Sequence, residues 1–326
     1  MNSLKFEGKG FAFFKIHLVN VILTILSLSF LYPWAKIREI KYILQNTYLA
    51  DNAFSFSGTV KDFFKGYVKT FLLFIVIFAI CIAGGVLSGI YRNTLLAGPI
   101  YWFTIVLAIG LIFYITPIVL HGSINYRFSN TSWLSISPSY NGKLSELVSI
   151  YFKGAVLSTL TAGIYKAWFQ VRLVKYILRS SRFGSIKFDF TGEAKPLFLI
   201  FLKGFFLSLI TFGIYGIWFA KQVYEYTVNN IVVKKDDQEF KLQSDANTLE
   251  IFEMIVGNVL LTCLTLGIGA SWAYMRYYHF MINHCVVPAE FNFSSANEVP
   301  ETEEEIEGAG STKQNWLDKW NPVLIA

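Results

Sequence analysis

The sequence predicts an α-helical polytopic membrane protein built from about five degenerate repeats, with short β-strands between its membrane helices. Three observations lead to this fold class. The first is composition, because 54% of the residues are hydrophobic and 15% are charged, whereas soluble domains carry roughly 25% charged residues. The second is a set of long uncharged apolar runs, and the third is a short pattern that recurs beside them.

The apolar runs supply six candidate membrane segments. The longest of them can cross a hydrocarbon core about 30 Å thick, and the shortest lie at the lower limit of that length. The first run ends in an aromatic-Pro-aromatic sequence at Tyr32 instead of a small-residue cleavage site, so we expect a retained membrane helix and no cleaved signal. The six segments are 18–34, 71–90, 101–120, 154–168, 204–220 and 254–275.

The recurring pattern is T-x-G-I-Y-x-x-W. It is clearest at residues 161–168 and 211–218, and further copies lie at 265–272, more loosely at 27–34, and in a worn form around Pro117. An Arg or Gln follows each of the four clear Trp residues by four positions, and a Tyr or Phe follows it by eight. A repeat of about 50 residues indicates that one supersecondary unit recurs along the chain.

Each part of the pattern has a local physical meaning. Gly163, Gly213 and Gly267 favour the left-handed conformation that ends helices. The hydroxyl two residues earlier can bond the carbonyls that such a break frees. Tyr and Trp beside the break are typical of the membrane–water interface.

Short alternating segments of the F-x-F-x-G type follow the Trp residues by about twenty positions. Their period of two and terminal turn residue predict short strands, which need partners because unpaired edges leave backbone groups unsatisfied. We expect these segments to pair with one another, at least two by two. The candidates are 4–8, 54–58, 134–138, 188–192, 240–244 and 291–295.

The distribution of charge fits a simple topology poorly. Six crossings with the N-terminus inside would divide Lys and Arg almost equally between the two sides, at about fourteen each, whereas cytoplasmic loops normally carry an excess. We therefore keep six crossings as the default and re-entrant segments as the alternative. Residues 1–295 form the membrane domain, and the acidic residues 296–326 are expected to be a disordered tail.

No motif for catalysis, for a cofactor or for a metal is present. His279, His284 and Cys285 lack the spacing of a zinc site, and the sequence contains no phosphate-binding loop or nucleophile elbow. We expect no cofactor and no enzyme activity. The net charge of +6 comes from cations at the ends of apolar runs, which favours contact with anionic membrane lipids over nucleic acid. A homo-oligomer remains an option.

Two sets of residues are candidates for function. The aromatic–cation positions are expected to lie at the headgroup level and to bind anionic lipid, with pairing to carboxylates such as Glu39 or Glu225 as the alternative; they are Arg38, Arg172, Arg276, Trp34, Trp168, Trp218 and Trp272. A pathway would instead use groups inside apolar runs, namely Lys203, Thr161, Thr211 and Thr265.

Three functional hypotheses follow. Transport or permeation of a small solute or lipid is placed first, because Gly-interrupted helices can build substrate sites where they break. A non-catalytic scaffold that organises lipids in the envelope is the alternative. A lipid-modifying enzyme is the least favoured.

The combined pattern T-x-G-I-Y-x-x-W-x-x-x-R-x-x-x-Y, followed by F-x-F-x-G, resembles that of the YjgN family of bacterial inner-membrane proteins of unknown function. The similarity extends to about residue 295. It implies a multi-pass protein of the bacterial inner membrane and assigns no chemistry to any residue. The chain departs from the pattern in its first unit, which lacks T-x-G, and at Gln222, where Arg is expected.

Overall fold

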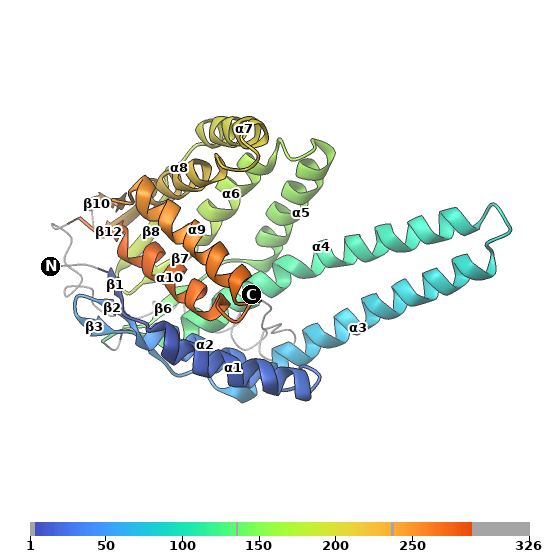
Figure 1. Ribbon diagram of the computed structural model, residues 1–326, viewed down its shortest axis with the longest axis horizontal. Helices are drawn as coiled ribbons and strands as arrows, with labels where there is room; N and C mark the ends of the chain where they lie inside the picture. The colour runs from blue at the N-terminus through green and yellow to red at the C-terminus, as the bar shows by residue number, and fades with distance from the viewer. Residues whose placement is uncertain (1–3, 135, 236–237, 289–326) are drawn as a thin grey trace.

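The computed structural model describes residues 4–134, 136–235 and 238–288. Within them the chain forms ten helices, which pair in sequence order into five helical hairpins (Figure 1). Neighbouring hairpins pack against each other, and α10 returns to pack against α1, which closes a ring. The helices are α1 (Gly10–Leu26), α2 (Tyr32–Gln45), α3 (Val60–Ile90), α4 (Ala97–Asn130), α5 (Leu144–Leu160), α6 (Lys166–Arg179), α7 (Ala194–Ile210), α8 (Gly216–Asn229), α9 (Thr248–Leu264) and α10 (Ala270–Asn283).

Hairpin lengths separate one unit from the rest. In four of the described hairpins the first helix has 17 residues and the second has 14. The α3/α4 hairpin has 31 and 34 residues and projects far beyond the others (Figure 1). In the described part of the chain, α3 and α4 are the two helices long and apolar enough to cross a membrane.

The turns of the short hairpins are formed by the T-x-G pattern. Gly163, Gly213 and Gly267 have φ values of 90°, 90° and 91°, and each follows a residue whose φ is also positive. The Thr161 hydroxyl donates to the Leu157 carbonyl at 2.7 Å and accepts from the Tyr165 amide at 3.0 Å. The prediction that these glycines end their helices is confirmed, since α5, α7 and α9 stop three residues before them.

The looser and worn copies behave differently from each other. Ser29 takes the place of glycine in the first hairpin, with φ of 70°, and Ser27 accepts from the Leu31 amide at 3.0 Å. The first copy therefore makes the same kind of turn without glycine. Around Pro117 the helix α4 continues, so the worn copy makes no turn and leaves its hairpin long.

The interpretation of four apolar runs as single membrane segments is corrected. Residues 18–34, 154–168, 204–220 and 254–275 each contain the turn of a short hairpin. Hydropathy does not register these turns because the turn residues are themselves apolar. The segment 71–90 lies entirely within α3 and the segment 101–120 entirely within α4, in agreement with the sequence.

Each hairpin is closed at its base by a pair of strands. The strand before the first helix pairs antiparallel with the strand after the second helix. These pairs are β1 (Leu4–Phe6) with β2 (Thr47–Leu49), β4 (Ser55–Phe56) with β5 (Thr131–Ser132), β6 (Pro138–Tyr140) with β7 (Ser181–Phe183), β8 (Ile186–Phe190) with β9 (Ile231–Lys235), and β11 (Gln243–Ser244) with β12 (Cys285–Val286).

The F-x-F-x-G prediction is therefore right about strands and wrong about their partners. Residues 54–58 and 188–192 overlap β4 and β8, yet neither pairs with another segment of its type. Residues 134–138 contribute a single bridge and the start of β6, and residues 240–244 fall on β10 (Gln238–Lys241) and β11. The candidate at 291–295 lies outside the described residues.

Strands from separate hairpins meet in one layer. β7 also pairs with β8, and β9 pairs with β10, which gives a five-stranded sheet in the order β10-β9-β8-β7-β6. β3 (Asn52–Ala53) extends the β1–β2 pair. A buried cluster joins the sheets, and the Trp133 indole at its centre donates to the carbonyls of Leu49 at 3.1 Å and Asn52 at 3.0 Å.

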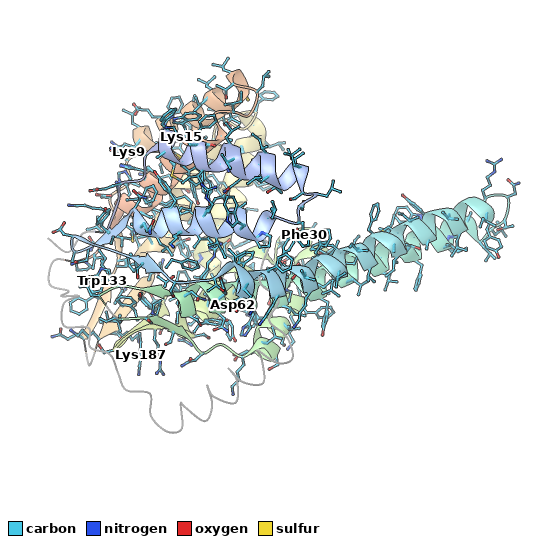
Figure 2. All side chains as sticks on the ribbon, turned by 90° about the horizontal axis from the view of Figure 1, so that it is seen from below. Lys9, Lys15, Phe30, Asp62, Trp133 and Lys187 are labelled. Carbon is cyan, nitrogen blue, oxygen red and sulfur yellow. The ribbon has the colours of Figure 1, made fainter. Side chains whose placement is uncertain are left out.

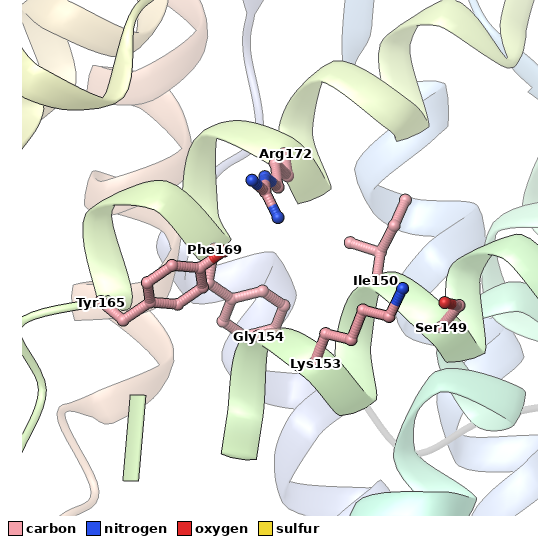
Figure 3. A pocket seen from close by; sticks show the side chains of 7 residues that line it. All are labelled: Ser149, Ile150, Lys153, Gly154, Tyr165, Phe169 and Arg172. Carbon is pink, nitrogen blue, oxygen red and sulfur yellow. The ribbon is translucent and has the colours of Figure 1, made fainter. Parts of the chain in front are cut away.

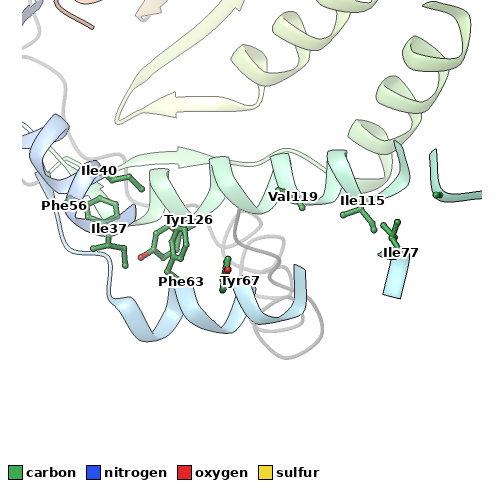
Figure 4. Close-up of a cluster of buried hydrophobic side chains, with 10 residues drawn as sticks. Ile37, Ile40, Phe56, Phe63, Tyr67, Ile77, Ile115, Val119 and Tyr126 are labelled. Carbon is green, nitrogen blue, oxygen red and sulfur yellow. The ribbon is translucent and has the colours of Figure 1, made fainter. Parts of the chain in front are cut away.

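A second apolar cluster fixes the long hairpin to its neighbour α2. Phe63 of α3 is fully buried and packs edge-on against Tyr126 of α4, with Ile37 and Ile40 of α2 beside them (Figure 4). The base of α3 and α4 is thus part of the ring, and their far ends project from it.

In four of the described hairpins, a tyrosine near the end of the second helix fastens the base. The hydroxyl of Tyr176 donates to the Lys143 carbonyl at 2.7 Å, and that carbonyl belongs to the residue that caps α5. The equivalent bonds run from Tyr42 to Lys9, from Tyr126 to Thr59 and from Tyr226 to Glu193. The last hairpin has Phe280 instead, and there Asn247 and Glu250 form a capping box on α9.

Replacing Tyr176 with Phe is expected to lower the free energy of unfolding by about 1 kcal/mol, because the Lys143 carbonyl loses its donor. Tyr151→Phe in the same hairpin is the control, since the Tyr151 ring packs against Phe169 and its hydroxyl makes no hydrogen bond to the described residues. Denaturant unfolding in detergent measures both. Equal losses in the two variants would contradict the role of the Tyr176 hydroxyl.

Replacing Gly213 with Ala is expected to cost about 1–2 kcal/mol, because φ of 90° is unfavourable for a residue with a Cβ although no atom stands in its way. Gly216→Ala, at the start of α8, also meets no atom and should stabilise the helix slightly. The same unfolding experiment compares them. A neutral Gly213→Ala would show that the left-handed turn is not required.

Candidate functional site

An apolar surface surrounds the turns of the short hairpins. Leu28 is 85% exposed, Phe212 is 97% exposed and Leu266 is 94% exposed, and each lies within a turn. The helix ends beside them are also exposed and apolar, as at Leu26, Leu160, Ile210 and Leu264. Large exposed apolar surfaces mark contact with a membrane or a protein. The opposite ends of the hairpins are covered by the strand layer.

Cations lie a short distance from this surface. Lys153 precedes the end of α5 by seven residues, which places its Cα about 10 Å from the turn. Arg172 follows the start of α6 by six residues, about 9 Å along the returning helix. The hairpin therefore brings the two residues to the same level, although nineteen positions separate them in the sequence.

Lys153 and Arg172 line one cavity. It has a volume of about 150 Å³ and is lined by Ser149, Ile150, Lys153, Gly154, Tyr165, Phe169 and Arg172, a set without a carboxylate. The Lys153 ammonium and the Arg172 guanidinium both point into this space (Figure 3). Arg172 also lies over the Tyr165 ring, 5.8 Å from its centroid. Two cations and a hydroxyl around a small cavity suit an anion with several oxygen acceptors.

A glycine contact sets the spacing of the two helices at this cavity. A Cβ on Gly154 would lie 2.0 Å from the Phe169 ring, so the ring packs directly on the backbone of α5. The α7/α8 hairpin has the same contact between Gly204 and Phe219, at 2.2 Å. There Lys203 occupies the lysine position and Gln222 the arginine position, and Gln222 donates to the Tyr215 hydroxyl at 3.2 Å.

The other two predicted arginines lie on separate hairpins. Arg38 lies over the Trp34 ring, 4.4 Å from its centroid, and Arg276 donates to the Glu253 carbonyl at 3.3 Å. The carboxylates considered as alternative partners are engaged elsewhere, because Glu39 bonds His17 and Glu225 bonds Lys221, each at 3.1 Å. Within the described residues, Arg38, Arg172 and Arg276 form no ion pair.

The predicted tryptophans lie in the first turn of the second helices and mainly contact other rings. Trp168 packs 5.2 Å from Phe198 of α7, and Trp272 stacks 4.5 Å from Phe14 of α1, so both join neighbouring hairpins. Trp218 is 41% exposed beside Tyr215. The four tryptophans and three arginines thus occupy four hairpins and do not form one site.

The predicted pathway residues are not brought together either. Thr161, Thr211 and Thr265 lie in three different turns, where each hydroxyl donates to the carbonyl four residues earlier. Lys203 is exposed on α7. Neither the cavity at Arg172 nor the second cavity, at Arg276, includes any of these four residues.

The second cavity, of about 300 Å³, lies where α9 and α10 meet the start of α1. Its lining includes Glu250, Arg276, His279 and His284, and the His284 ring contacts Asp245 at 2.8 Å. No metal-binding group of three His, Cys, Asp or Glu occurs in the described part of the chain. Burial, with the charge of Asp245 as a smaller cause, raises the pKa of the nearby Cys285 thiol to about 11, so that thiol is a poor nucleophile near neutral pH.

The strand layer carries an ion-pair network. Asp189 of β8 contacts Arg179 at 2.7 Å and Lys234 at 3.6 Å. Burial opposes the ionisation of Asp189, but the Arg179 hydrogen bond, the Phe190 amide and the two positive charges outweigh it and lower its pKa. This network links α6 to the strands β8 and β9.

Sequence reasoning identified Arg172 but not its association with Lys153 and Ser149. The sequence contains one clue to this association. Nineteen residues separate Lys153 from Arg172 across the T-x-G turn, and the same spacing separates Lys203 from Gln222. This spacing predicts that the two side chains are neighbours only if the turn is known to reverse the chain. The role of the tyrosine eight residues after Trp34, Trp168 and Trp218 was also missed, because its partner is a backbone carbonyl.

Comparison with known proteins gives two matches. Over 75 residues the chain is 35% identical to a protein of Salmonella typhimurium named "Inner membrane protein YjgN", a match that covers 23% of this chain and 19% of that relative. The chain thus aligns with about a fifth of that relative's length. No solved structure matches. Residues 1–230 and 205–312 match the family described as "Bacterial protein of unknown function (DUF898)", so the chain belongs to that family, in agreement with the resemblance seen in the sequence.

Proposed function

We propose that this chain is a polytopic inner-membrane protein, built from five copies of one hairpin unit, that binds the phosphates of anionic lipids and organises them without catalysis. The observation that carries the proposal is the cavity at Lys153 and Arg172, where two cations meet without a carboxylate, about 10 Å from an exposed apolar turn. A lipid whose acyl chains lie along the apolar turn presents its phosphate at that level.

The distribution of charge supports two crossings, by α3 and α4. Between Lys69 and Arg127 the sequence contains one Lys or Arg, which is Arg92 in the loop that joins these helices. Residues 70–91, which comprise the uncharged remainder of α3 and the residue after it, span about 33 Å. This length is enough to cross the hydrocarbon core. The other cations of the described residues lie on the side of the strand layer or along the short hairpins, which supports placing that side in the cytoplasm.

This topology also avoids the difficulty that six crossings would divide Lys and Arg almost equally between the two sides of the membrane. Short hairpins that return to the strand layer keep both flanking loops on one side, so their cations add to the cytoplasmic excess. The curated relative's name, "Inner membrane protein YjgN", supports the same location for this chain.

The geometry favours lipid organisation over transport. A pathway would need polar groups of several helices around one cavity, whereas Thr161, Thr211 and Thr265 bond their own helices and Lys203 faces outward. A non-catalytic role fits the chemistry of the site as well, since Lys153, Arg172 and Ser149 have no neighbouring general base in the cavity.

Replacing Arg172 with Ala is expected to reduce the binding of phosphatidylglycerol relative to phosphatidylcholine by roughly fivefold, because each cation contributes about 1 kcal/mol. The matched variant is Gln222→Arg, which places Arg opposite Lys203 in a hairpin with the same Gly–Phe contact and should create a second site. Native mass spectrometry counts the lipids that each protein keeps. Equal phosphatidylglycerol binding by wild type and Arg172→Ala would refute the site.

The source of the phosphate is tested in the same experiment. Millimolar inorganic phosphate should leave phosphatidylglycerol in place if the acyl chains contribute to binding. Displacement of the lipid by phosphate alone would instead assign the cavity to a free anion.

The topology is tested by thiol labelling in a variant whose three cysteines are replaced. Cysteine at Asn93, in the α3/α4 loop, is expected to react with an impermeant reagent added to intact spheroplasts. Cysteine at Lys187, exposed in the strand layer, should react after the membrane is opened. Labelling of Lys187→Cys from outside would reverse the orientation, and protection of both sites would exclude the crossing.

A further inference from the structure

The short hairpins differ from α3 and α4 in how deep they can reach. Their bases are closed by strand pairs, so a hairpin that enters the membrane must return to the same side. A helix of 17 residues is about 25 Å long, and its strand-side part belongs to the ring. The length of helix between the level of Lys153 and Arg172 and the turn is about 10 Å, which is less than half of a hydrocarbon core of about 30 Å.

Contacts between the first two hairpins fix their relative depth. The Tyr67 hydroxyl of α3 donates to the Ser29 carbonyl in the first turn at 2.9 Å, and the Phe64 and Phe30 rings meet at 5.0 Å. Beyond this level α3 continues from residue 68 to residue 90, about 35 Å further. Figure 2 shows α3 and α4 extending alone past Phe30, with Lys9 and Lys187 at the opposite end.

The turns also carry a conformation that is unusual for their residues. Leu28, Phe212 and Leu266 have φ values of 49°, 51° and 51°, in the left-handed region that bulky side chains rarely adopt. Gly or Asn would fit that backbone better. These three side chains are also almost fully exposed. A strained backbone that presents a large apolar side chain outward indicates that the side chain is needed there, in contact with an apolar phase.

From these observations we infer that the four short hairpins insert only into the headgroup–acyl boundary of the strand-side leaflet, since the first turn lies level with Tyr67, just before the uncharged residues 70–91. The protein then acts as a wedge and prefers membranes that are convex on the strand side. The inference rests on the proposed two-crossing topology. Ten helices then meet the strand-side leaflet and two reach the far leaflet. At a helix diameter of about 10 Å, the excess of eight helices displaces on the order of 600 Å² in one leaflet. Shallow apolar insertion of this kind is sensitive to curvature.

The test uses the full chain in giant vesicles, oriented with the strand layer outward, from which narrow membrane tubes are drawn. Wild type is expected to be enriched at least threefold on the tube relative to the flat vesicle. The variant Leu28→Asn, Phe212→Asn and Leu266→Asn removes the apolar side chains with a residue that tolerates positive φ. Its enrichment should fall to about one, while α3 and α4 keep it in the membrane.

The α5/α6 hairpin offers an internal control, because Ala162 occupies the equivalent position there with φ of 50°. Ala162→Asn should leave the enrichment unchanged, and Ala162→Leu should increase it. Thermal unfolding confirms that every variant is folded. Equal enrichment of wild type and the triple variant, or no enrichment of wild type, would overturn the wedge. Thiol labelling at Asn93 separates that result from failure of the topology, since an incorrect topology alters the labelling and an incorrect wedge does not.

Discussion

The antiparallel strand pair at the base of each hairpin is the constraint on which this structure depends. Pairs as short as β4 with β5 or β11 with β12 are too small to be stable alone. They hold because residues next to these strands, such as Phe54, Trp133 and Leu242, join strands of other hairpins in one buried cluster, and because a tyrosine or a capping box fastens the start of each first helix. Since both ends of every hairpin are held in one layer, no hairpin can cross the membrane an odd number of times.

Features that depend on a few neighbouring residues were predictable from the sequence. Features that depend on the chain folding back on itself to close a hairpin were not. The turn at Gly213 could be predicted because positive φ is a property of one residue and its neighbours. The strand at β8 could be predicted from its alternation, but its partner β9 lies beyond a whole hairpin. The cavity at Arg172 could not be predicted for the same reason, because Lys153 becomes a neighbour of Arg172 only when the turn reverses the chain. Hydropathy merged each helix, turn and helix into one run because Leu28 and Phe212 are apolar at positions where soluble proteins place Gly or Asn.

The five described hairpins share the strand pairs that hold each base together, and they differ in the charged residues near their turns. In four hairpins Tyr42, Tyr126, Tyr176 or Tyr226 of the second helix bonds the start of the first helix, whereas in the fifth α9 is capped by its own Asn247 and Glu250. The cations near the turns are less regular. Lys153 and Arg172 line one cavity, Lys203 and Gln222 occupy the equivalent positions of the next hairpin, and Gly257 lies against Arg276. The fold therefore tolerates different charges at this level, which allows a lipid site at one hairpin without requiring it at all.

The turns and the cavity divide two tasks between hairpins, and the energies explain why. A bulky residue held at positive φ costs roughly 1–2 kcal/mol, whereas moving a Leu or Phe side chain from water into an apolar phase gains about 1.5–3 kcal/mol. Leu28, Phe212 and Leu266 are therefore unfavourable in water and favourable in lipid. Ala162 gains little from lipid, and its hairpin is the one that combines Lys153 with Arg172. Under the proposed topology, three short hairpins would hold the membrane by apolar insertion, and the fourth would hold it by charge.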